Sequence, residues 1–295
     1  MNHIPHTRAM HVFHGERIWI DPQWQERLAG IGLGRGKDWT RLASKDAVSA
    51  SYHTTGNFRF TLSDGQAVYF KRYVYRKFRW KYWLQAAKAA VEAAGFRDLS
   101  KLGIDTIQVL AYGEKRRLGL LRASFIVTLE IPDTVELGQY LARQWLDFPY
   151  AKKHRILARL QTTLVQQLQT AHRAGFFHRD LKLRNILLLQ NKESPALIWI
   201  DCPRSRWLSA NHNHAIASEF ASMARVAVRV LTPGQRLRFV LAYCNGERSE
   251  ARTLYRDVAA RLDKNPARPF WHLLAKDDPR RIAELARISE QNGGE

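Results

Sequence analysis

The sequence predicts an α+β fold in two parts, a small strand-rich part followed by a larger helical part. Three observations lead to this prediction. Five short segments rich in β-branched and aromatic residues lie before residue 130, and one alanine-rich helical segment interrupts them. A long amphipathic pattern begins near residue 151. After residue 201 the periodicity is again that of helices.

The strand-rich part is expected at residues 45–130, after an N-terminal extension, residues 1–44, whose structure the sequence does not predict. Asp64-Gly65 separates two apolar segments and is a strong signal for a β-hairpin. A helix is expected at residues 82–94, with Gly95 as the residue that ends it. The five expected strands are residues 47–52, 57–62, 67–73, 106–112 and 124–130.

The helical part is expected at residues 131–295. Its clearest helix is residues 151–174, because the apolar side chains fall on one face and Gly175 follows. Two short apolar strands are expected next, at residues 186–190 and 196–200. The remaining helices are expected at residues 215–231, 235–243, 248–262 and 278–290.

The strongest chemical pattern is His178-Arg179-Asp180-Leu181-Lys182-Leu183-Arg184-Asn185, which fits the catalytic loop of protein-kinase-like phosphotransferases. A hydroxyl that attacks phosphorus needs a carboxylate to orient it and accept its proton, and Asp180 has that chemistry. Lys182 would supply a cation near the phosphoryl group; it cannot be the base, because it is charged at neutral pH. Asn185 offers an oxygen ligand for Mg²⁺. The alternative is a basic surface loop that matches by chance.

Asp201 follows the second short strand, at the place where such enzymes carry their main magnesium ligand. Cys202-Pro203 stands where Phe-Gly is usual. Because proline fixes φ, we expect no inward and outward flipping of this segment. The alternative is an aspartate that caps a turn at the end of a strand.

Lys71, in the third strand, has the position of the lysine that holds the α- and β-phosphates of ATP. Such a lysine needs a carboxylate on the following helix, and Glu92 is the candidate. Glu130 and Ile131, where the two parts join, are expected to offer backbone groups to adenine. Tyr69 stands where the pattern usually has Ala, so the surface above adenine must be built differently. The alternative for Lys71 and Glu92 is an ordinary solvated side chain.

These segments together resemble the lipopolysaccharide kinase family. The resemblance rests on the lysine strand, the helix glutamate, FFHRDLKLRNILL at residues 176–188 and IWID at residues 198–201. The stretches at residues 102–106, 111–113 and 124–128 resemble the same family. The similarity covers about residues 45–205.

The resemblance implies a protein-kinase-like two-lobed fold, with a small β-rich N-lobe and a larger helical C-lobe. It implies ATP- and Mg²⁺-dependent phosphorylation of a heptose or 3-deoxy-manno-octulosonic acid (Kdo) hydroxyl in the lipopolysaccharide inner core. The implied roles are catalysis for Asp180 and Lys182, ATP binding for Lys71, Glu92, Glu130 and Ile131, and Mg²⁺ binding for Asn185 and Asp201. A lipopolysaccharide core or another anionic glycolipid is the expected acceptor.

Two other functions stay open. A serine/threonine protein kinase would carry the same catalytic residues, although no Ala-Pro-Glu motif follows Cys202-Pro203 before the next expected helix. A non-catalytic kinase-like protein that binds nucleic acid or acts as a scaffold would be expected to have lost a key residue. All of the key residues are present.

Residues 71–83 interleave six cations with six aromatic residues. This mixture suits an interface where anionic head groups meet acyl chains. It suits single-stranded nucleic acid equally well, through stacking and phosphate contacts. The third interpretation is aromatic residues that pack inside the domain while the charges stay solvated.

Composition narrows the class of protein. The chain has 295 residues, 45% of them hydrophobic, which excludes a disordered chain. Its formal net charge of +20 indicates anionic partners, for which a phosphorylated glycolipid accounts better than nucleic acid. Two cysteines without a paired spacing suggest neither a disulfide framework nor a zinc site. Without an apolar leader or an 18-residue apolar run, the expected location is the cytoplasm, in contact at most with the inner membrane's cytoplasmic face.

Overall fold

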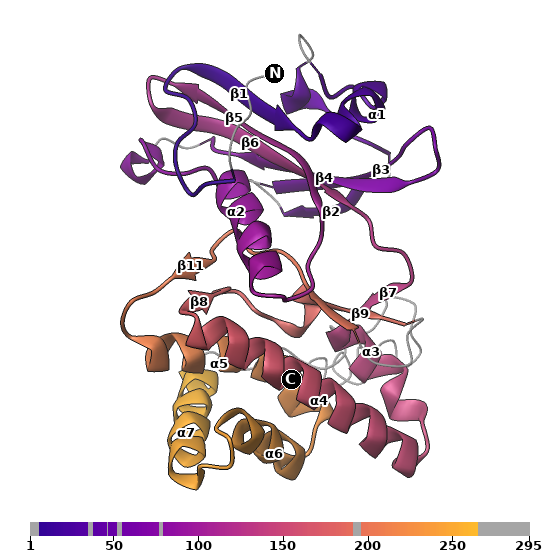
Figure 1. The fold of residues 1–295 in the computed structure, drawn as a ribbon, viewed down its shortest axis with the longest axis vertical. Helices are drawn as coiled ribbons and strands as arrows, with labels where there is room; N and C mark the ends of the chain where they lie inside the picture. The colour runs from indigo at the N-terminus through magenta and orange to yellow at the C-terminus, as the bar shows by residue number, and fades with distance from the viewer. Residues whose placement is uncertain are drawn as a thin grey trace, which may run out of the picture. The chain divides into compact units, whose positions relative to one another are not determined.

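The computed structural model describes residues 6–34, 38–45, 47–51, 55–76, 79–190 and 196–264. The chain forms two compact units, which Figure 1 shows as ribbons. Unit 1 consists of Met1–Pro132 and Asp201–Ser205, and unit 2 of Asp133–Ile200 and Arg206–Glu295. Unit 1 is built on a sheet and unit 2 is mostly helical, so the predicted α+β class is confirmed.

Unit 1 contains a six-stranded antiparallel sheet with the order β1-β5-β6-β4-β3-β2. Helix α2 (Lys88–Lys101) packs on one face of this sheet, against β5 and β6. The other face is covered by the short helix α1 (Gln25–Gly30) and its neighbours, which bury Trp24, Leu28 and Trp39. The strands are β1 (Gly15–Ile20), β2 (Ala47–Ser51), β3 (Thr55–Thr61), β4 (Ala67–Val74), β5 (Val109–Arg117) and β6 (Leu120–Leu129).

The N-terminal segment contributes structure that the sequence does not predict. Strand β1 pairs with β5 in antiparallel register, from Gly15 opposite Arg116 to Ile20 opposite Ala111. Leu33, from the glycine-rich stretch after α1, is fully buried in the same core. β1 begins with Gly-Glu-Arg and has only three apolar residues, so its sequence gives a weak strand signal.

Helix α2 differs from its prediction at both ends. Residues 80–82 form a short 3-10 helix, η3 (Trp80–Tyr82), and α2 begins only at Lys88. Gly95 does not end the helix, which continues to Lys101. A Cβ atom at Gly95 would lie 2.6 Å from both Cys202 Sγ and Ser205 Oγ. Glycine is therefore present for a close approach within unit 1, and not as a helix terminator.

Unit 2 consists mainly of helices, together with two small sheets. A three-stranded sheet has the order β10-β9-β7, and β8 pairs with β11. Helix α4 packs against α6, and α5 packs against α7. The strands are β7 (Thr134–Glu136), β8 (Phe176–Phe177), β9 (Ile186–Leu189), β10 (Ala196–Trp199) and β11 (Arg206–Trp207). The helices are α3 (Leu137–Arg143), α4 (Tyr150–Arg173), α5 (His212–Val230), α6 (Pro233–Tyr243) and α7 (Arg248–Lys264).

Most expected elements of unit 2 are found within a few residues of their predicted bounds. The expected helix at residues 278–290 and the residues between the two expected strands, 191–195, lie outside the described residues. Within the described parts of the chain, the structure has no helix that combines the length and the apolar character needed to cross a bilayer.

Candidate active site

Strand β4 presents its residues alternately to the two faces of the sheet. Val68 and Phe70 enter the hydrophobic core on the α1 side. Tyr69, Lys71 and Tyr73 therefore point to the opposite face, where α2 packs. This period of two places the predicted lysine and two tyrosines in one row.

Lys71 lies between two carboxylates of unit 1. Its Nζ donates a hydrogen bond to Glu92 Oε1 at 3.1 Å, and it forms a second ion pair with Asp201 Oδ1. Burial alone would lower the pKa of Lys71, but the two carboxylates outweigh burial and raise it. The ammonium group therefore stays charged.

Tyr73 is a site residue that the sequence reading missed. Its hydroxyl donates to Glu92 Oε2 at 2.6 Å, so both oxygens of this buried carboxylate are used. Burial raises the pKa of Glu92, and the proximity of Lys71 opposes that rise. Burial also raises the pKa of Tyr73, which keeps its hydroxyl a hydrogen-bond donor. The alternation Lys71-Arg72-Tyr73 on a strand was the signal that could have identified it.

Asp201 is positioned by the segment that follows it. Its φ is +60°, a left-handed conformation that is uncommon outside glycine and that Asn and Asp adopt more readily than most other residues. Cys202 is fully buried, and its thiol donates to the backbone oxygen of Glu92 at 3.6 Å. Burial raises the pKa of the Cys202 thiol well above its usual value, so this cysteine is not a nucleophile. Cys202 thus ties the segment after Asp201 to the helix that carries Glu92.

The predicted catalytic loop lies in unit 2, between β8 and β9. Lys182 Nζ forms an ion pair with Asp180 Oδ1 at 2.7 Å. The Asn185 side chain donates through Nδ2 to the backbone oxygen of Asp180 at 2.8 Å, which leaves Oδ1 as the atom that can act as a ligand. His178 is fully buried and donates through Nε2 to the Ile200 carbonyl at 2.9 Å. These contacts bring Asp180, Lys182 and Asn185 together.

A buried chain of side chains supports this loop from behind. Arg179 has a φ of +64°, and its backbone N–H donates to Glu219 Oε1 on α5 at 2.5 Å. The other oxygen of Glu219 lies 3.0 Å from His172 Nε2 on α4. His172 Nδ1 lies 2.8 Å from the hydroxyl of Tyr243 on α6. His172 thus connects Glu219 on α5 to Tyr243 on α6.

The predicted site residues therefore form two clusters. In unit 1, Lys71 contacts both Glu92 and Asp201. In unit 2, the second cluster contains Asp180, Lys182 and Asn185.

Glu130 takes part in a polar group on the sheet of unit 1. Arg59 donates to both of its carboxylate oxygens, at 2.9 and 2.7 Å, and the Tyr69 hydroxyl donates to Oε1 at 2.7 Å. Burial raises the pKa of Tyr69 to about 12, and the hydrogen bond with Glu130 contributes to this rise. The Glu130 backbone N–H is used within the sheet, as a donor to the Ala67 carbonyl at 2.9 Å. Any backbone contact from Glu130 to a purine must then come from its carbonyl oxygen.

The donor atoms in these clusters suit Mg²⁺. Asn185 and Asp201 offer amide and carboxylate oxygens, the hard ligands that Mg²⁺ prefers. No group of three or more His, Cys, Asp or Glu side chains is placed to hold a metal among the described residues. Mg²⁺ needs no such group, because water and phosphate oxygens fill most of its six positions.

Comparison with known proteins identifies the family. The sequence profile of the lipopolysaccharide kinase (Kdo/WaaP) family matches residues 37–243, more than half of the chain. This chain belongs to that family. A solved structure, "WaaP in complex with acyl carrier protein", superimposes with a TM-score of 0.60 at 22% identity. That likeness covers 93% of this chain and 98% of the other and shows a shared fold.

Individual relatives carry two different names. The lipopolysaccharide core heptose(I) kinase WaaP of Pseudomonas aeruginosa is 30% identical over 179 residues, or 59% of this chain and 65% of the relative. The enzyme of the same name from Escherichia coli (strain K12) is 36% identical over 90 residues, or 30% of this chain and 33% of the relative. The 3-deoxy-D-manno-octulosonic acid kinase of Vibrio vulnificus is 25% identical over 192 residues, or 63% of this chain and 68% of the relative. The matches thus span between one third and about two thirds of these relatives.

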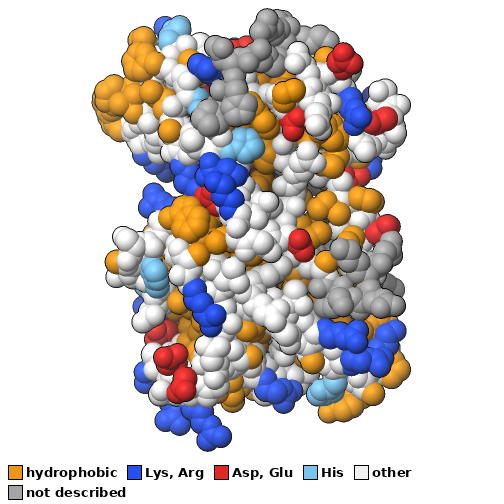
Figure 2. All heavy atoms as spheres, viewed as in Figure 1, with side chains coloured by type: hydrophobic (Ala, Val, Ile, Leu, Met, Phe, Trp, Pro, Cys, Tyr) orange, Lys and Arg blue, Asp and Glu red, His pale blue; other side chains and the backbone are white. Residues whose placement is uncertain are grey.

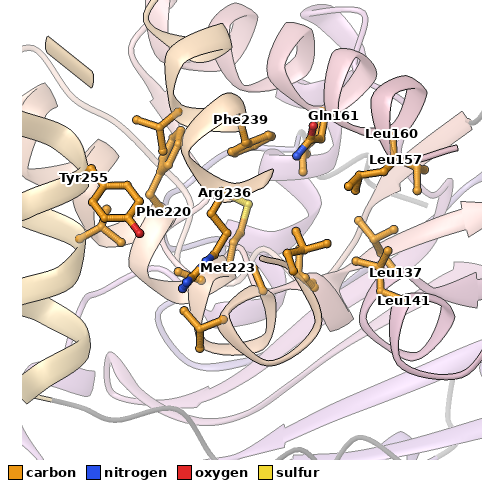
Figure 3. A pocket seen from close by; sticks show the side chains of 18 of the residues that line it. Leu137, Leu141, Leu157, Leu160, Gln161, Phe220, Met223, Arg236, Phe239 and Tyr255 are labelled. Carbon is orange, nitrogen blue, oxygen red and sulfur yellow. The ribbon is translucent and has the colours of Figure 1, made fainter. Parts of the chain in front are cut away.

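Unit 2 also contains an apolar cavity that sequence reading did not predict. Its volume is about 160 Å³, and most of its lining comes from helices α3 to α7. Figure 3 shows Leu137, Leu160, Phe220 and Met223 around it. The cavity forms where five amphipathic helices meet, and a single helix pattern gives no sign of such a space.

Proposed function

We propose that this member of the lipopolysaccharide kinase (Kdo/WaaP) family transfers the γ-phosphoryl group of ATP to a sugar hydroxyl of the lipopolysaccharide inner core. The observation that carries the proposal is the placement of Lys71 between Glu92 and Asp201. A kinase orients phosphates with a strand lysine that is paired with a helix glutamate, beside a second carboxylate that can hold Mg²⁺. The loop that holds Asp180, Lys182 and Asn185 supplies the remaining chemical groups.

The cluster of unit 1 would bind the donor. Lys71 would hold the α- and β-phosphates, and Glu92 would fix the position of Lys71 with help from Tyr73. Adenine would contact the backbone of Glu130 and Ile131. The hydrogen-bonded side chains of Arg59, Tyr69 and Glu130 would form the surface above adenine, where the pattern usually has the small residue Ala in place of Tyr69.

The loop of unit 2 would act on the acceptor. Asp180 would orient the sugar hydroxyl and take its proton as the oxygen attacks phosphorus. Lys182, already paired with Asp180, would place positive charge beside the phosphoryl group. Asn185 and Asp201 would hold Mg²⁺, which when bound offsets the negative charge of the phosphates.

An acceptor panel tests this proposal. The purified chain, with labelled ATP and Mg²⁺, is offered core oligosaccharide that contains heptose, core that contains only Kdo, and serine/threonine peptides. Label in either core supports the proposal and names the sugar, which the heptose(I) kinase and Kdo kinase relatives leave open. Label only in peptides would indicate the protein-kinase alternative. ATP binding without transfer to any acceptor would indicate the non-catalytic alternative.

An acyl carrier protein is a second proposed partner. One solved structure that shares the fold of this chain is named as a complex with such a protein. The lining of the apolar cavity of unit 2 is suited to an acyl chain. Alanines of α5 contribute to this lining, so replacing one with a larger residue would narrow the cavity. We expect acylated carrier protein to be retained on the immobilised chain, and Ala227→Leu, which narrows the cavity, to weaken retention. Ser218→Leu on the exposed side of α5 is the control. Equal retention of acylated and unacylated carrier would exclude a role for the cavity.

A further inference from the structure

Five large hydrophobic side chains are exposed together at one end of the sheet of unit 1. Trp80 is 74% exposed and Leu118 is 63% exposed, and the other three are each about half exposed. Orange side chains gather beside Lys and Arg at the upper left of Figure 2, over the end of the β5–β6 hairpin. The members of this apolar patch are Phe13, Trp80, Trp83, Leu84 and Leu118.

Specific contacts hold the patch in place. Trp83 donates through Nε1 to the Leu118 carbonyl at 3.0 Å, and its ring lies 6.2 Å from that of Trp80 in an edge-to-face arrangement. The backbone of Gly119 accepts from Leu84 N–H at 3.2 Å and donates to Phe13 O at 2.7 Å. Three segments distant in sequence therefore meet around one hairpin turn. Of the eight large hydrophobic residues exposed in the described part of the chain, five belong to this patch.

The sequence of the turn between β5 and β6 does not match the residues that its backbone conformation favours. Leu118 and Gly119 connect β5 to β6, and both have positive φ, +49° and +77°. Two-residue turns of this kind favour Asn-Gly, because a branched side chain is strained at positive φ. Here a leucine holds that position with its side chain in water. Leu118 is unfavourable here both because of its positive φ and because its apolar side chain is exposed to water. Such a residue indicates a function for its side chain.

The surroundings of the patch are basic. Residues 71–85 and 115–122 contain no Asp or Glu. On β1, Glu16 is the acidic residue opposite Lys115. The exposed cations beside the patch are Arg76, Arg79, Lys81, Lys115, Arg117 and Arg122. Exposed tryptophans next to exposed Lys and Arg have the composition of surfaces that enter the head-group region of anionic bilayers.

We propose that this patch docks unit 1 onto an anionic lipid surface, with Trp80, Trp83 and Leu118 inserted and the surrounding cations on lipid phosphates. The structure separates the two halves of the basic aromatic run. Tyr73 and Tyr75 are buried, whereas Trp80 and Trp83 point outward, so internal packing does not account for the second half. Lipid docking does not depend on the proposed phosphoryl transfer, although both would place the chain beside a glycolipid acceptor.

Flotation with vesicles tests the proposal. The chain is mixed with vesicles of phosphatidylcholine alone, or of phosphatidylcholine with about one third phosphatidylglycerol. We expect flotation with the anionic vesicles only. Trp80→Ser and Leu118→Asn should each reduce the bound fraction roughly fivefold or more, because binding scales with inserted apolar area. Tyr150→Ser removes an equally exposed aromatic ring from unit 2 and should float as the wild type does.

Leu118→Asn also separates binding from folding. Asparagine suits the turn better than leucine, so the thermal midpoint of this variant should stay the same or rise while lipid binding falls. Transfer to soluble core oligosaccharide should be unchanged, which distinguishes a failure of lipid docking from a failure of the proposed activity. Equal flotation with neutral vesicles, flotation of Leu118→Asn at the wild-type level, or an equal loss in Tyr150→Ser would overturn the proposal. So would binding of single-stranded oligonucleotide by the patch with no vesicle binding.

Discussion

Glu219 on helix α5 accepts the backbone N–H of Arg179, the residue directly before Asp180. Arg179 has a left-handed conformation, which needs support from its surroundings. The second oxygen of Glu219 contacts His172 on α4. One buried carboxylate thus connects two helices to the loop that presents the proposed base.

Glu219→Ala should lower the kcat for phosphate transfer at least about tenfold and the unfolding free energy by about 1–3 kcal/mol, because it leaves a buried N–H unpaired. Glu219→Gln keeps an oxygen for Arg179 and should recover most of both. The KM for ATP should change little in either variant, since Glu219 is not among the residues proposed to contact ATP. Steady-state kinetics, normalised to the concentration of folded protein, measures kcat and the KM for ATP. Urea unfolding of the same samples measures the unfolding free energy. A kcat loss as large in Glu219→Gln as in Glu219→Ala would contradict it.

Tyr73→Phe should raise the KM for ATP several-fold. The change removes the hydroxyl that donates to Glu92 Oε2, so the partner of Lys71 is less well fixed. Tyr75→Phe is the matched control, because the Tyr75 hydroxyl is buried nearby but contacts Ser124 and the Lys88 amide. Both variants should lose about 1 kcal/mol of stability. An equal rise in KM in both variants would show that the Tyr73 contact with Glu92 has no special role.

The pH dependence of stability should have opposite signs for two glutamates. Burial raises the pKa of Glu92 in the folded state, so the folded state binds the proton more tightly than the unfolded state. The wild-type chain should therefore lose stability relative to Glu92→Gln as pH rises above about 4.5. The hydrogen bond from Arg59 lowers the pKa of Glu130, so the wild type should lose stability relative to Glu130→Gln as pH falls below the same value. Urea unfolding from about pH 3.5 to 7 measures both differences. Parallel curves for the two pairs would refute the assignment.

Gly95→Ala should destabilise the chain although alanine favours helices. The new methyl group would lie within 2.6 Å of Cys202 and Ser205, so the segment after Asp201 must move. Gly138→Ala in α3 is the control, because its methyl group meets Leu183 Cβ at an ordinary 3.5 Å. We expect a lower thermal midpoint and reduced transfer for Gly95→Ala, and an unchanged or higher midpoint for Gly138→Ala. Retention of wild-type activity and stability in Gly95→Ala would contradict the close approach.

The sequence predicts those parts of the fold in which local pattern and packing agree. Helix α4 and the hairpin of β3 and β4 are found near their predicted bounds, because periodicity and turn residues both mark them. The sequence wrongly predicts a helix end at Gly95, because a glycine needed for close contact with Cys202 has the same sequence signal as one that ends a helix. Strand β1 was missed because its pairing with β5 is set by tertiary contacts.

The candidate site shows the same division. Lys71 and Asp180 could be selected because each belongs to a pattern with fixed spacing. Glu219 and the apolar patch around Leu118 could not, because their roles arise from contacts between residues far apart in the chain. Strand alternation places Tyr73 on the same face as Lys71, but it gives no sign of the contact between Tyr73 and Glu92.

The most direct test of the central claim is transfer of phosphate from ATP to purified inner core by the wild-type chain and by Asp180→Asn. Asparagine keeps the size of the side chain and removes the base. We predict that mass spectrometry finds core that gains one phosphate with the wild type, and a rate at least about a hundredfold lower with Asp180→Asn. Transfer by Asp180→Asn at the wild-type rate, or no gain of phosphate on any core with the folded wild type, would contradict the account.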